Sequence, residues 1–196
     1  MAVFIFATHN DHKLEEVQTM LSSSGIDIVS LKDKDFHEDI EETGSTMDAN
    51  ALIKSRTIYN AFHQPVFSDD SGLEVMALDM EPGVHTARYA GPEKDSEANM
   101  SKLLDRMKGI EDRRAQFRAV VALIWDGEEY LFEGVVKGRI AQEKKGDGGF
   151  GYDPIFIPDG FDESFAELGS ELKNGMSHRF RAIDKMRRFL ETKKAD

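Results

Sequence analysis

The chain has 196 residues, with 25 lysines and arginines against 37 aspartates and glutamates, and its formal net charge is -12 at pH 7. It contains no cysteine, which excludes disulfide scaffolds, zinc–thiolate centres and cysteine nucleophiles. The acidic balance argues against a protein that coats a nucleic-acid polymer by bulk charge, because phosphates repel such a surface. A local basic pocket is still compatible with it.

The length favours a single domain over residues 1–196. Hydrophobic residues make up 40% of the chain, which is enough for a sizeable core. No basic stretch precedes the first apolar run, and no segment approaches about 18 consecutive apolar residues, so we expect neither a signal peptide nor a membrane span. The lack of disulfides is compatible with a cytoplasmic location.

The first third of the chain alternates between strand and helix patterns. Residues 3–7 form a short apolar run, which predicts a buried strand. Apolar side chains spaced i, i+3 and i+7 over residues 14–21 predict a helix that ends near Gly25. Residues 26–31 are a second strand candidate, and the acid-rich residues 33–48 predict mostly a solvated loop.

Two further helices are predicted in the central part of the chain. Ser45 and Asp48 resemble a capping box, and they predict a helix over about residues 47–62 that ends before Pro65. Apolar side chains on one face indicate a helix over about residues 96–108.

The strongest strand pattern is a hairpin. Residues 115–125 and 128–141 flank Asp126-Gly127, a dipeptide typical of a two-residue hairpin turn. A last helix is predicted from Ser177 to about Leu190. Because the hairpin is antiparallel while strands and helices otherwise alternate, we expect an α/β fold with a central mixed β-sheet flanked by helices.

The first candidate site is the turn Thr8–Lys13, between the first strand and the first helix. Such turns lie at the carboxyl ends of strands, where α/β proteins commonly bind ligands. The N–H groups of a helix start, together with Lys13, would attract a phosphate. A helix cap followed by a surface lysine explains the same residues.

The second candidate is the segment Ser68–Gly72, in which Asp69 and Asp70 are adjacent. Two carboxylates held together repel each other unless a cation or protons neutralise them. Magnesium favours one or two carboxylates together with substrate phosphate oxygens, and Glu41 and Glu42 are further acids elsewhere in the chain. A polar turn is the alternative, because Asp, Ser and Gly all favour turns.

The third candidate is the glycine-rich segment of residues 146–154. Seven of the 16 glycines lie between residues 134 and 160. Such a loop lets its backbone approach a ligand, and Phe150 or Tyr152 would offer a stacking face. A β-turn region without a ligand is the alternative.

The fourth candidate is the start of the last helix, with Lys173, His178 and Arg179. Residues 173–194 hold eight lysines and arginines against two acidic residues, whereas the rest of the chain is strongly acidic. This asymmetry suggests a local anionic partner. A cation at a helix N-terminus opposes the helix dipole, a conflict expected at functional sites, while a solvated helix face explains the later cations.

These four candidates together suit a magnesium-dependent enzyme that acts on a nucleoside phosphate. At the same residues the chain resembles the inosine triphosphate pyrophosphatase family, the non-canonical purine nucleoside triphosphate pyrophosphatases. Six segments carry the resemblance in order along nearly the whole chain: FATHNDHKLEEV, EETGSTMDANALIKSR, FSDDSGLEV, PGVHTARYAG, GDGGFGYDPIF and KNGMSHRFRAI.

The resemblance implies hydrolysis of ITP, dITP and XTP to the nucleoside monophosphate and pyrophosphate, which removes deaminated purines from the nucleotide pool. It also implies a magnesium-dependent, cytoplasmic homodimer whose mixed sheet carries two lobes around an active-site cleft. The substrate would be a free nucleotide, with no nucleic-acid polymer and no membrane as partner.

The resemblance also implies roles for individual residues. Glu42 and Asp70 match the magnesium-linked carboxylates, and Asp70 also matches the catalytic group that accepts a proton from water attacking the α-phosphorus. Donors facing the purine O6 would exclude adenine, whose amino group would leave them unpaired. The substrate-binding residues that match the family are Thr8, Asn10, Lys13, Lys54, Ser71, Phe150, Gly151, Tyr152, Asp153, Lys173, His178 and Arg179. His9, Asp11 and His12 belong to the same first turn and are counted with it as substrate-binding candidates, although the family commonly has small residues where His9 and His12 stand.

Two alternatives stay open at this point. The first is a related pyrophosphatase of the Maf type, with a pyrimidine or modified base as substrate. The second is a non-enzymatic RNA-binding protein that uses the basic C-terminal helix, whose affinity would fall steeply with salt.

Overall fold

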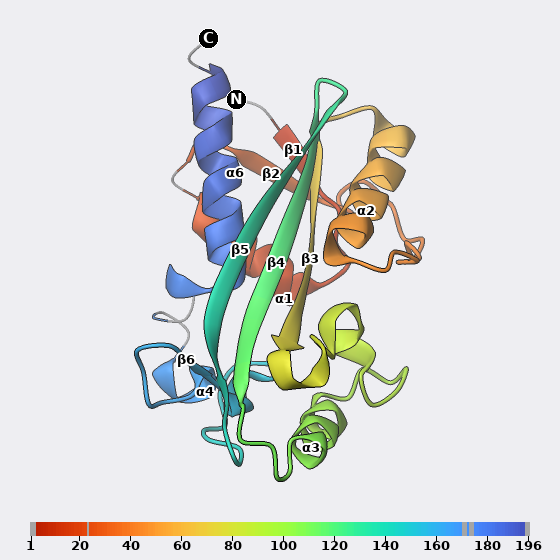
Figure 1. The fold of residues 1–196 in the computed structure, drawn as a ribbon. Coiled ribbons are helices and arrows are strands. Elements are labelled where there is room, and N and C mark those ends of the chain that lie inside the picture. The colour runs from red at the N-terminus through yellow and green to blue at the C-terminus, as the bar shows by residue number, and fades with distance from the viewer. Residues whose placement is uncertain (1–2, 23, 170–171, 173–174, 195–196) are drawn as a thin grey trace. The chain divides into compact units, whose positions relative to one another are not determined.

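The computed structural model describes residues 3–22, 24–169, 172 and 175–194 of the chain (Figure 1). Its sheet has the strand order β2-β1-β3-β4-β5-β6. The strands are β1 (Val3–Phe6), β2 (Asp27–Ser30), β3 (Val66–Val75), β4 (Arg114–Trp125), β5 (Glu128–Ile140) and β6 (Phe156–Pro158). The α-helices are α1 (Asp11–Leu21), α2 (Met47–Phe62), α3 (Ser96–Arg106), α4 (Phe165–Leu168) and α6 (His178–Lys194).

The sheet is mixed, as the sequence predicts. Strand β1 pairs in parallel with β2 and with β3, whereas β5 pairs with β6 in antiparallel orientation. Strands β4 and β5 are joined by Asp126 and Gly127, whose φ angles are 55° and 78°. Two consecutive positive φ angles are what a type I′ hairpin turn requires, which explains the Asp-Gly dipeptide at this point.

The predicted elements are confirmed with small changes at their ends. Helix α2 has the predicted bounds, α3 ends two residues early, and α6 begins at His178 and continues to Lys194. The predicted capping residue of α2 is wrong, because the Thr46 side chain, and not that of Ser45, accepts the hydrogen bond from the Ala49 N–H. None of the helices in the described part of the chain has the length and apolar character needed to cross a bilayer.

The chain forms two compact units. The first comprises Met1–Asp70, Ala119–Gly134 and Arg179–Asp196, and the second comprises Ser71–Arg118 and Val135–His178. Strands β3, β4 and β5 therefore each contribute residues to both units. The expectation of one domain over residues 1–196 stays a prediction.

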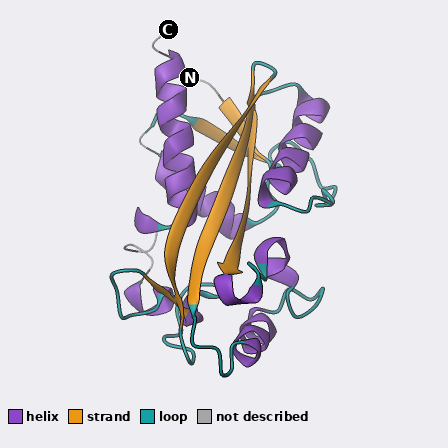
Figure 2. Ribbon diagram, in the orientation of Figure 1, coloured by secondary structure: helices purple, strands orange, loops and turns teal. Residues whose placement is uncertain are grey.

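The first unit has apolar packing on both faces of its strands, with α1 and α6 on one face and α2 on the other (Figure 2). Successive side chains of a strand point to opposite faces, and β1 follows this rule. Phe4 and Phe6 pack with α1 and α6, while Ile5 packs with Ile58 of α2. The same alternation in β3 decides where its carboxylates point.

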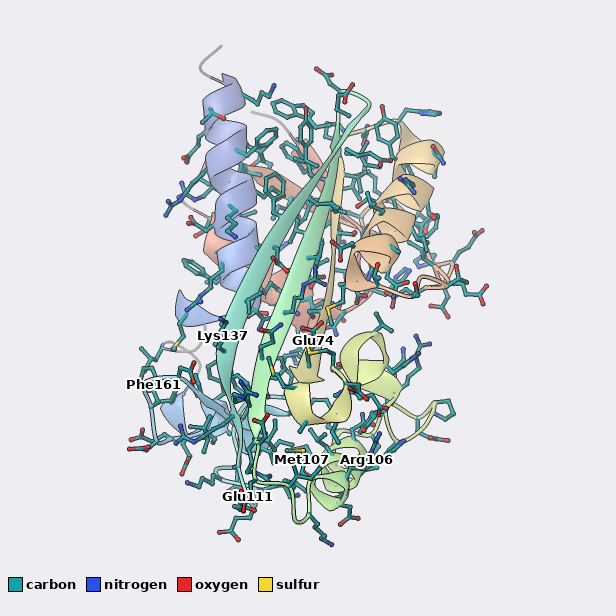
Figure 3. All side chains as sticks on the ribbon, viewed as in Figure 1. Glu74, Arg106, Met107, Glu111, Lys137 and Phe161 are labelled. Atoms are coloured by element: carbon teal, nitrogen blue, oxygen red, sulfur yellow. The ribbon has the colours of Figure 1, made fainter. Side chains whose placement is uncertain are left out.

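The second unit has its own core. Leu73 of β3, Leu103 of α3 and Phe117 of β4 are buried in it together with aromatic side chains that follow β5. Met107, just after α3, is fully buried in this core (Figure 3). The adjacent Arg106 instead donates a hydrogen bond to the Tyr89 hydroxyl at 2.8 Å. This unit carries the glycine-rich segment of residues 146–154.

Candidate active site

The dicarboxylate segment lies within strand β3 and is buried. The polar-turn alternative is therefore wrong, because residues 66–75 form one continuous strand. Asp69 and Asp70 are 1% and 8% exposed. Since neighbouring strand residues point to opposite faces, Asp69 lies on the side of α1 and α6, and Asp70 on the side of α2.

Asp69 is neutralised by two cations. The Lys13 ammonium lies 3.0 Å from its Oδ2, and the Arg179 Nε donates to the same oxygen at 3.0 Å. Burial acts to raise the pKa of Asp69, but Lys13, Arg179 and Lys54 outweigh it, so the pKa of this carboxyl is strongly lowered. Asp69 is thus ionised at neutral pH and pairs with the cations around it.

Lys13 is positioned by the start of α1. The Asn10 side chain caps this helix and accepts a hydrogen bond from the Lys13 N–H at 3.1 Å. The helix-cap interpretation is therefore right, but Lys13 is not a surface lysine, because its side chain is only 17% exposed. Burial, opposed by the Asp69 charge, lowers the pKa of Lys13.

Arg179 is positioned by two carboxylates. Besides Asp69, its guanidinium contacts Glu16 of α1, and the arginine side chain is almost fully buried. Arg179 lies in the first turn of α6, where a cation opposes the helix dipole, and these two acids offset that cost. The sequence does not single out Glu16, although it follows Lys13 by three residues on α1 and therefore lies on the same helix face.

Asp70 has a different environment from Asp69. The Lys54 ammonium lies 3.9 Å from Asp70 Oδ1 and 2.5 Å from Glu42 Oε1, so one cation bridges the two acids. Burial raises the pKa of Asp70; Lys54 and Lys13 oppose this effect and Glu42 adds to it, so the net pKa lies above the ordinary value. A buried carboxyl with a raised pKa beside a lysine is a typical catalytic environment.

Two buried serines fix α2 against the sheet at this point. The Ser68 hydroxyl of β3 donates to the Ala51 carbonyl at 2.6 Å, and the Ser55 hydroxyl donates to the Ala122 carbonyl at 2.7 Å. The two hydroxyl oxygens are 2.9 Å apart. Because Lys54 precedes Ser55, these contacts place its ammonium beside the Asp70 carboxylate of β3.

The remaining residues of the first turn lie toward solvent. His9 and His12 are exposed, and His9 Nε2 contacts the Glu38 carbonyl at 2.9 Å. Asp11 forms an exposed ion pair with Lys32, and the Thr8 hydroxyl accepts from the Asn10 N–H. Of the turn's side chains, Lys13 is the one that reaches the buried carboxylates.

The predicted substrate-binding residues of the glycine-rich segment, Phe150 to Asp153, belong to the second unit. Phe150 is 52% exposed, whereas the Tyr152 ring is buried in the core and its hydroxyl donates to the Thr86 carbonyl at 2.8 Å. Of the two rings expected to offer a stacking face, Phe150 is therefore the exposed one, and the prediction that Tyr152 binds substrate stays a prediction. Asp153 is buried and accepts from the Phe150 N–H at 2.8 Å, so it shapes the loop from within.

Gly149 shows why this loop is rich in glycine. Its φ is 77°, and a Cβ at this position would lie 2.2 Å from Asp153 Oδ2. The loop therefore requires glycine both for its backbone conformation and for the approach of the carboxylate. Gly151, with a φ of 63°, follows in the same loop.

The remaining predicted substrate-binding residues are His178, Ser71 and Lys173. The His178 ring is 9% exposed and stacks on Phe117 within the second unit, with ring centres 4.9 Å apart. Ser71 is the first residue of that unit in β3 and is half-buried. The prediction for Lys173 falls outside the residues that the structure describes.

Two acids of the first unit, Glu42 and Asp70, have the chemistry to bind a divalent cation. Among the described residues, no group of three or more His, Asp and Glu side chains is placed to hold a metal ion. Magnesium, however, needs few protein ligands, because one or two carboxylates, water and substrate phosphate oxygens complete its shell. Glu42 and Asp70, already bridged by a cationic ammonium, meet that requirement.

The mixed sheet and the carboxylate–lysine cluster on β3 define an α/β protein with a site suited to phosphate chemistry. The chain belongs to the Ham1 family, whose family model matches residues 4–189. This membership confirms the family resemblance found in the sequence.

The chain is similar to known proteins over nearly its whole length. The dITP/XTP pyrophosphatase of Porphyromonas gingivalis is 48% identical over 191 residues, which are 97% of this chain and 98% of that protein. The solved structure of the Staphylococcus aureus Ham1 protein has a TM-score of 0.90 at 41% identity, covering 97% of this chain and 99% of its own. A HAM1 protein from Coxiella burnetii has a TM-score of 0.92 at 36% identity, covering 98% and 100%.

Proposed function

We propose that the chain is a nucleoside triphosphate pyrophosphatase that hydrolyses dITP, ITP and XTP to the nucleoside monophosphate and pyrophosphate. Such an activity removes deaminated purines from the nucleotide pool. Membership of the Ham1 family and the name of the Porphyromonas gingivalis relative support this substrate class. The observation that carries the proposal is the Glu42–Lys54–Asp70 cluster, which combines a buried, raised-pKa carboxyl with a cation and a second acid.

We propose Mg²⁺ as the cofactor, held by Glu42 and Asp70. When bound, the ion would supply positive charge to the phosphate oxygens and orient them for in-line displacement. The proposal is supported by the donor set, because Mg²⁺ prefers one or two carboxylate side chains together with phosphate oxygens and water, and Glu42 and Asp70 are two carboxylates that contact the same ammonium.

Asp70, Lys13 and Lys54 would accept the proton and stabilise the developing charge. Asp70 would accept a proton from the attacking water while the water oxygen bonds to the α-phosphorus and the bond to the pyrophosphate oxygen breaks. Lys13 and Lys54 would offset the negative charge that develops on the departing pyrophosphate. Asp69 would take no part in proton transfer, because its lowered pKa makes it a weak base.

A further set of residues is proposed to recognise the purine. Phe150 is the exposed ring suited to stack on a base, and the backbone of its loop is held by Asp153. Lys173, His178 and Arg179 are the proposed donors toward the purine O6. An adenine amino group at that position would leave buried donors unpaired, which penalises ATP and dATP strongly.

The family resemblance also leads us to propose a cytoplasmic homodimer built from one domain per chain. Light scattering coupled to size-exclusion chromatography measures the oligomeric state directly. A mass of one chain at micromolar concentration would contradict the homodimer.

A nucleotide panel tests the proposed reaction. Pyrophosphate release is measured from ITP, dITP, XTP, GTP, dTTP and UTP, each with Mg²⁺ and with the ion removed by a chelator. We expect efficient turnover of the first three nucleotides, dependent on the divalent ion. A preference for dTTP or UTP would instead support a Maf-type enzyme, and no turnover with salt-sensitive RNA binding would support the RNA-binding alternative.

A further inference from the structure

Two side chains of α2 each contact both the loop that carries Glu42 and the strand that carries Asp70. Asn50 and Lys54 are four residues apart and therefore lie on one face of the helix. Lys54 contacts Glu42 and Asp70 through its ammonium. Asn50 accepts a hydrogen bond from the Gly44 N–H at 2.8 Å through its Oδ1, and its side chain also hydrogen-bonds Asp70. Both residues thus bridge the loop that carries Glu42 to the strand that carries Asp70.

The chemistry of this bridge requires an amide. Its oxygen is used by a backbone donor, which leaves the amide N–H groups for the Asp70 carboxylate. An aspartate at position 50 would present only acceptors to Asp70, and an aliphatic side chain would leave the Gly44 N–H without its partner. Asn50 is 2% exposed, so water does not replace either contact without a structural change.

The Gly44 backbone approaches α2 closely. A Cβ at position 44 would lie 2.6 Å from Asn50 Oδ1 and 2.7 Å from the Ala49 Cβ. The Thr46 cap fixes the same turn by accepting from the Ala49 N–H at 3.1 Å. The position of the Glu42 loop therefore depends on a glycine at 44 and on an amide at 50.

We propose that Asn50 is a positioning residue that sets the spacing between Glu42 and Asp70. This inference rests on the proposed function, because it assigns both carboxylates to one divalent cation. Lys54 cannot do the same work alone, since its ammonium carries charge and is the group offered to phosphate. Asn50 is neutral, so its two hydrogen bonds are compatible with the site both with and without a bound cation.

Binding of Mn²⁺ to the nucleotide-free full chain, followed by electron paramagnetic resonance, tests the inference without any turnover. We expect Asn50→Ala to raise the Kd for Mn²⁺ at least about ten-fold, because outer-shell partners of metal ligands typically contribute 10–100-fold to affinity. Gly44→Ala perturbs the same contact from the loop side and should weaken Mn²⁺ binding in the same direction, which keeps the inference testable if one variant fails to fold.

Asn99 offers a matched control. It is likewise buried, accepts from the Ala90 N–H at 2.6 Å and donates to the Ala87 carbonyl at 3.0 Å. Asn99→Ala therefore removes the same kind of hydrogen bonds, and we expect a loss of melting temperature with an unchanged Kd for Mn²⁺.

Asp70→Asn distinguishes a failure of the proposed metal site from a failure of the positioning role of Asn50. Mn²⁺ binding that is weakened by Asp70→Asn but unchanged by both Asn50→Ala and Gly44→Ala overturns the role of Asn50 and leaves the proposed function standing. Mn²⁺ binding that is unchanged by Asp70→Asn overturns the proposed metal site and this inference with it. Weakening by Asp70→Asn, Asn50→Ala and Gly44→Ala, but not by Asn99→Ala, supports it.

Discussion

The two faces of strand β3 treat adjacent carboxylates in opposite ways. On the face of α1 and α6, Asp69 is paired with Lys13 and Arg179, and its pKa is lowered although it is buried. On the face of α2, burial dominates and the pKa of Asp70 is raised. Burial alone therefore does not decide the protonation of these two acids, because nearby cations outweigh it at Asp69 and do not at Asp70.

This contrast assigns the two residues to different tasks. Asp69 contacts Lys13 of α1 and Arg179 of α6, so its loss should lower stability and also displace two residues of the proposed substrate site. Asp70 contacts Lys54, which also contacts Glu42, and its raised pKa means that it takes up a proton more readily than Asp69 does. Substitution of Asp69 should therefore cost stability, whereas substitution of Asp70 should cost turnover without a loss of stability.

The largest expected effect is that of Asp70→Asn on turnover. Because general-base catalysis typically contributes about 10²–10⁴-fold, kcat for ITP should fall by at least about 10²-fold. The melting temperature should not fall, since the substitution removes a buried carboxylate whose ionised form is disfavoured. Near wild-type turnover of the folded variant would break the assignment of Asp70 as proton acceptor.

Asp69→Ala should act on stability. Removing one partner of a buried ion pair typically costs about 3–5 kcal/mol, because the remaining charges are left uncompensated. Urea unfolding of the variant measures this loss as a lower midpoint. The exposed pair of Asp112 and Arg114, 2.7 Å apart, provides the control, and Asp112→Ala should cost much less. Equal losses for the two variants would contradict the anchoring role of Asp69.

The pH dependence of stability should sharpen the contrast. A lowered folded pKa means that ionised Asp69 stabilises the fold; this contribution is complete above the unfolded pKa of about 4 and is lost as the pH falls toward the folded pKa. A raised folded pKa means that ionised Asp70 destabilises the fold, and this penalty grows as the pH rises from about 4 through the folded pKa.

Asp69→Asn and Asp70→Asn should therefore shift the free energy of unfolding with opposite signs at pH 7. Urea unfolding from pH 7 down to pH 3 measures both shifts against the wild type. The part of each shift that comes from ionisation should shrink in acid. Shifts of the same sign at pH 7 would show that the two faces of β3 do not differ as described.

Much of the fold could be predicted from the sequence, because apolar periodicity is a local property. The helix over residues 47–62 and the hairpin around Asp126-Gly127 are examples. The capping residue could not be chosen reliably, since Ser45 and Thr46 are chemically equivalent as caps and only the backbone geometry separates them. Similarly, Tyr152 and Phe150 are alike in sequence, but only one ring enters the core.

The site was predicted in part. Local patterns indicate Lys13, the β3 acids and the start of α6 as candidates, but only the cations at the start of α6 conflict with a local preference. The contact between Glu16 and Arg179 joins residues 163 positions apart, and no local pattern reports such a pair. Asn50 was missed for a related reason, since a single amide in a helix resembles any polar surface residue until its contacts to Gly44 and Asp70 are known.

Hydrolysis of ITP in ¹⁸O-labelled water requires turnover and locates the attacked phosphorus, so it decides whether the chain performs the proposed reaction. Attack of water on the α-phosphorus predicts that the label appears in inosine monophosphate and that the released pyrophosphate is unlabelled. Label in the pyrophosphate, or release of inorganic phosphate in place of pyrophosphate, would contradict the account.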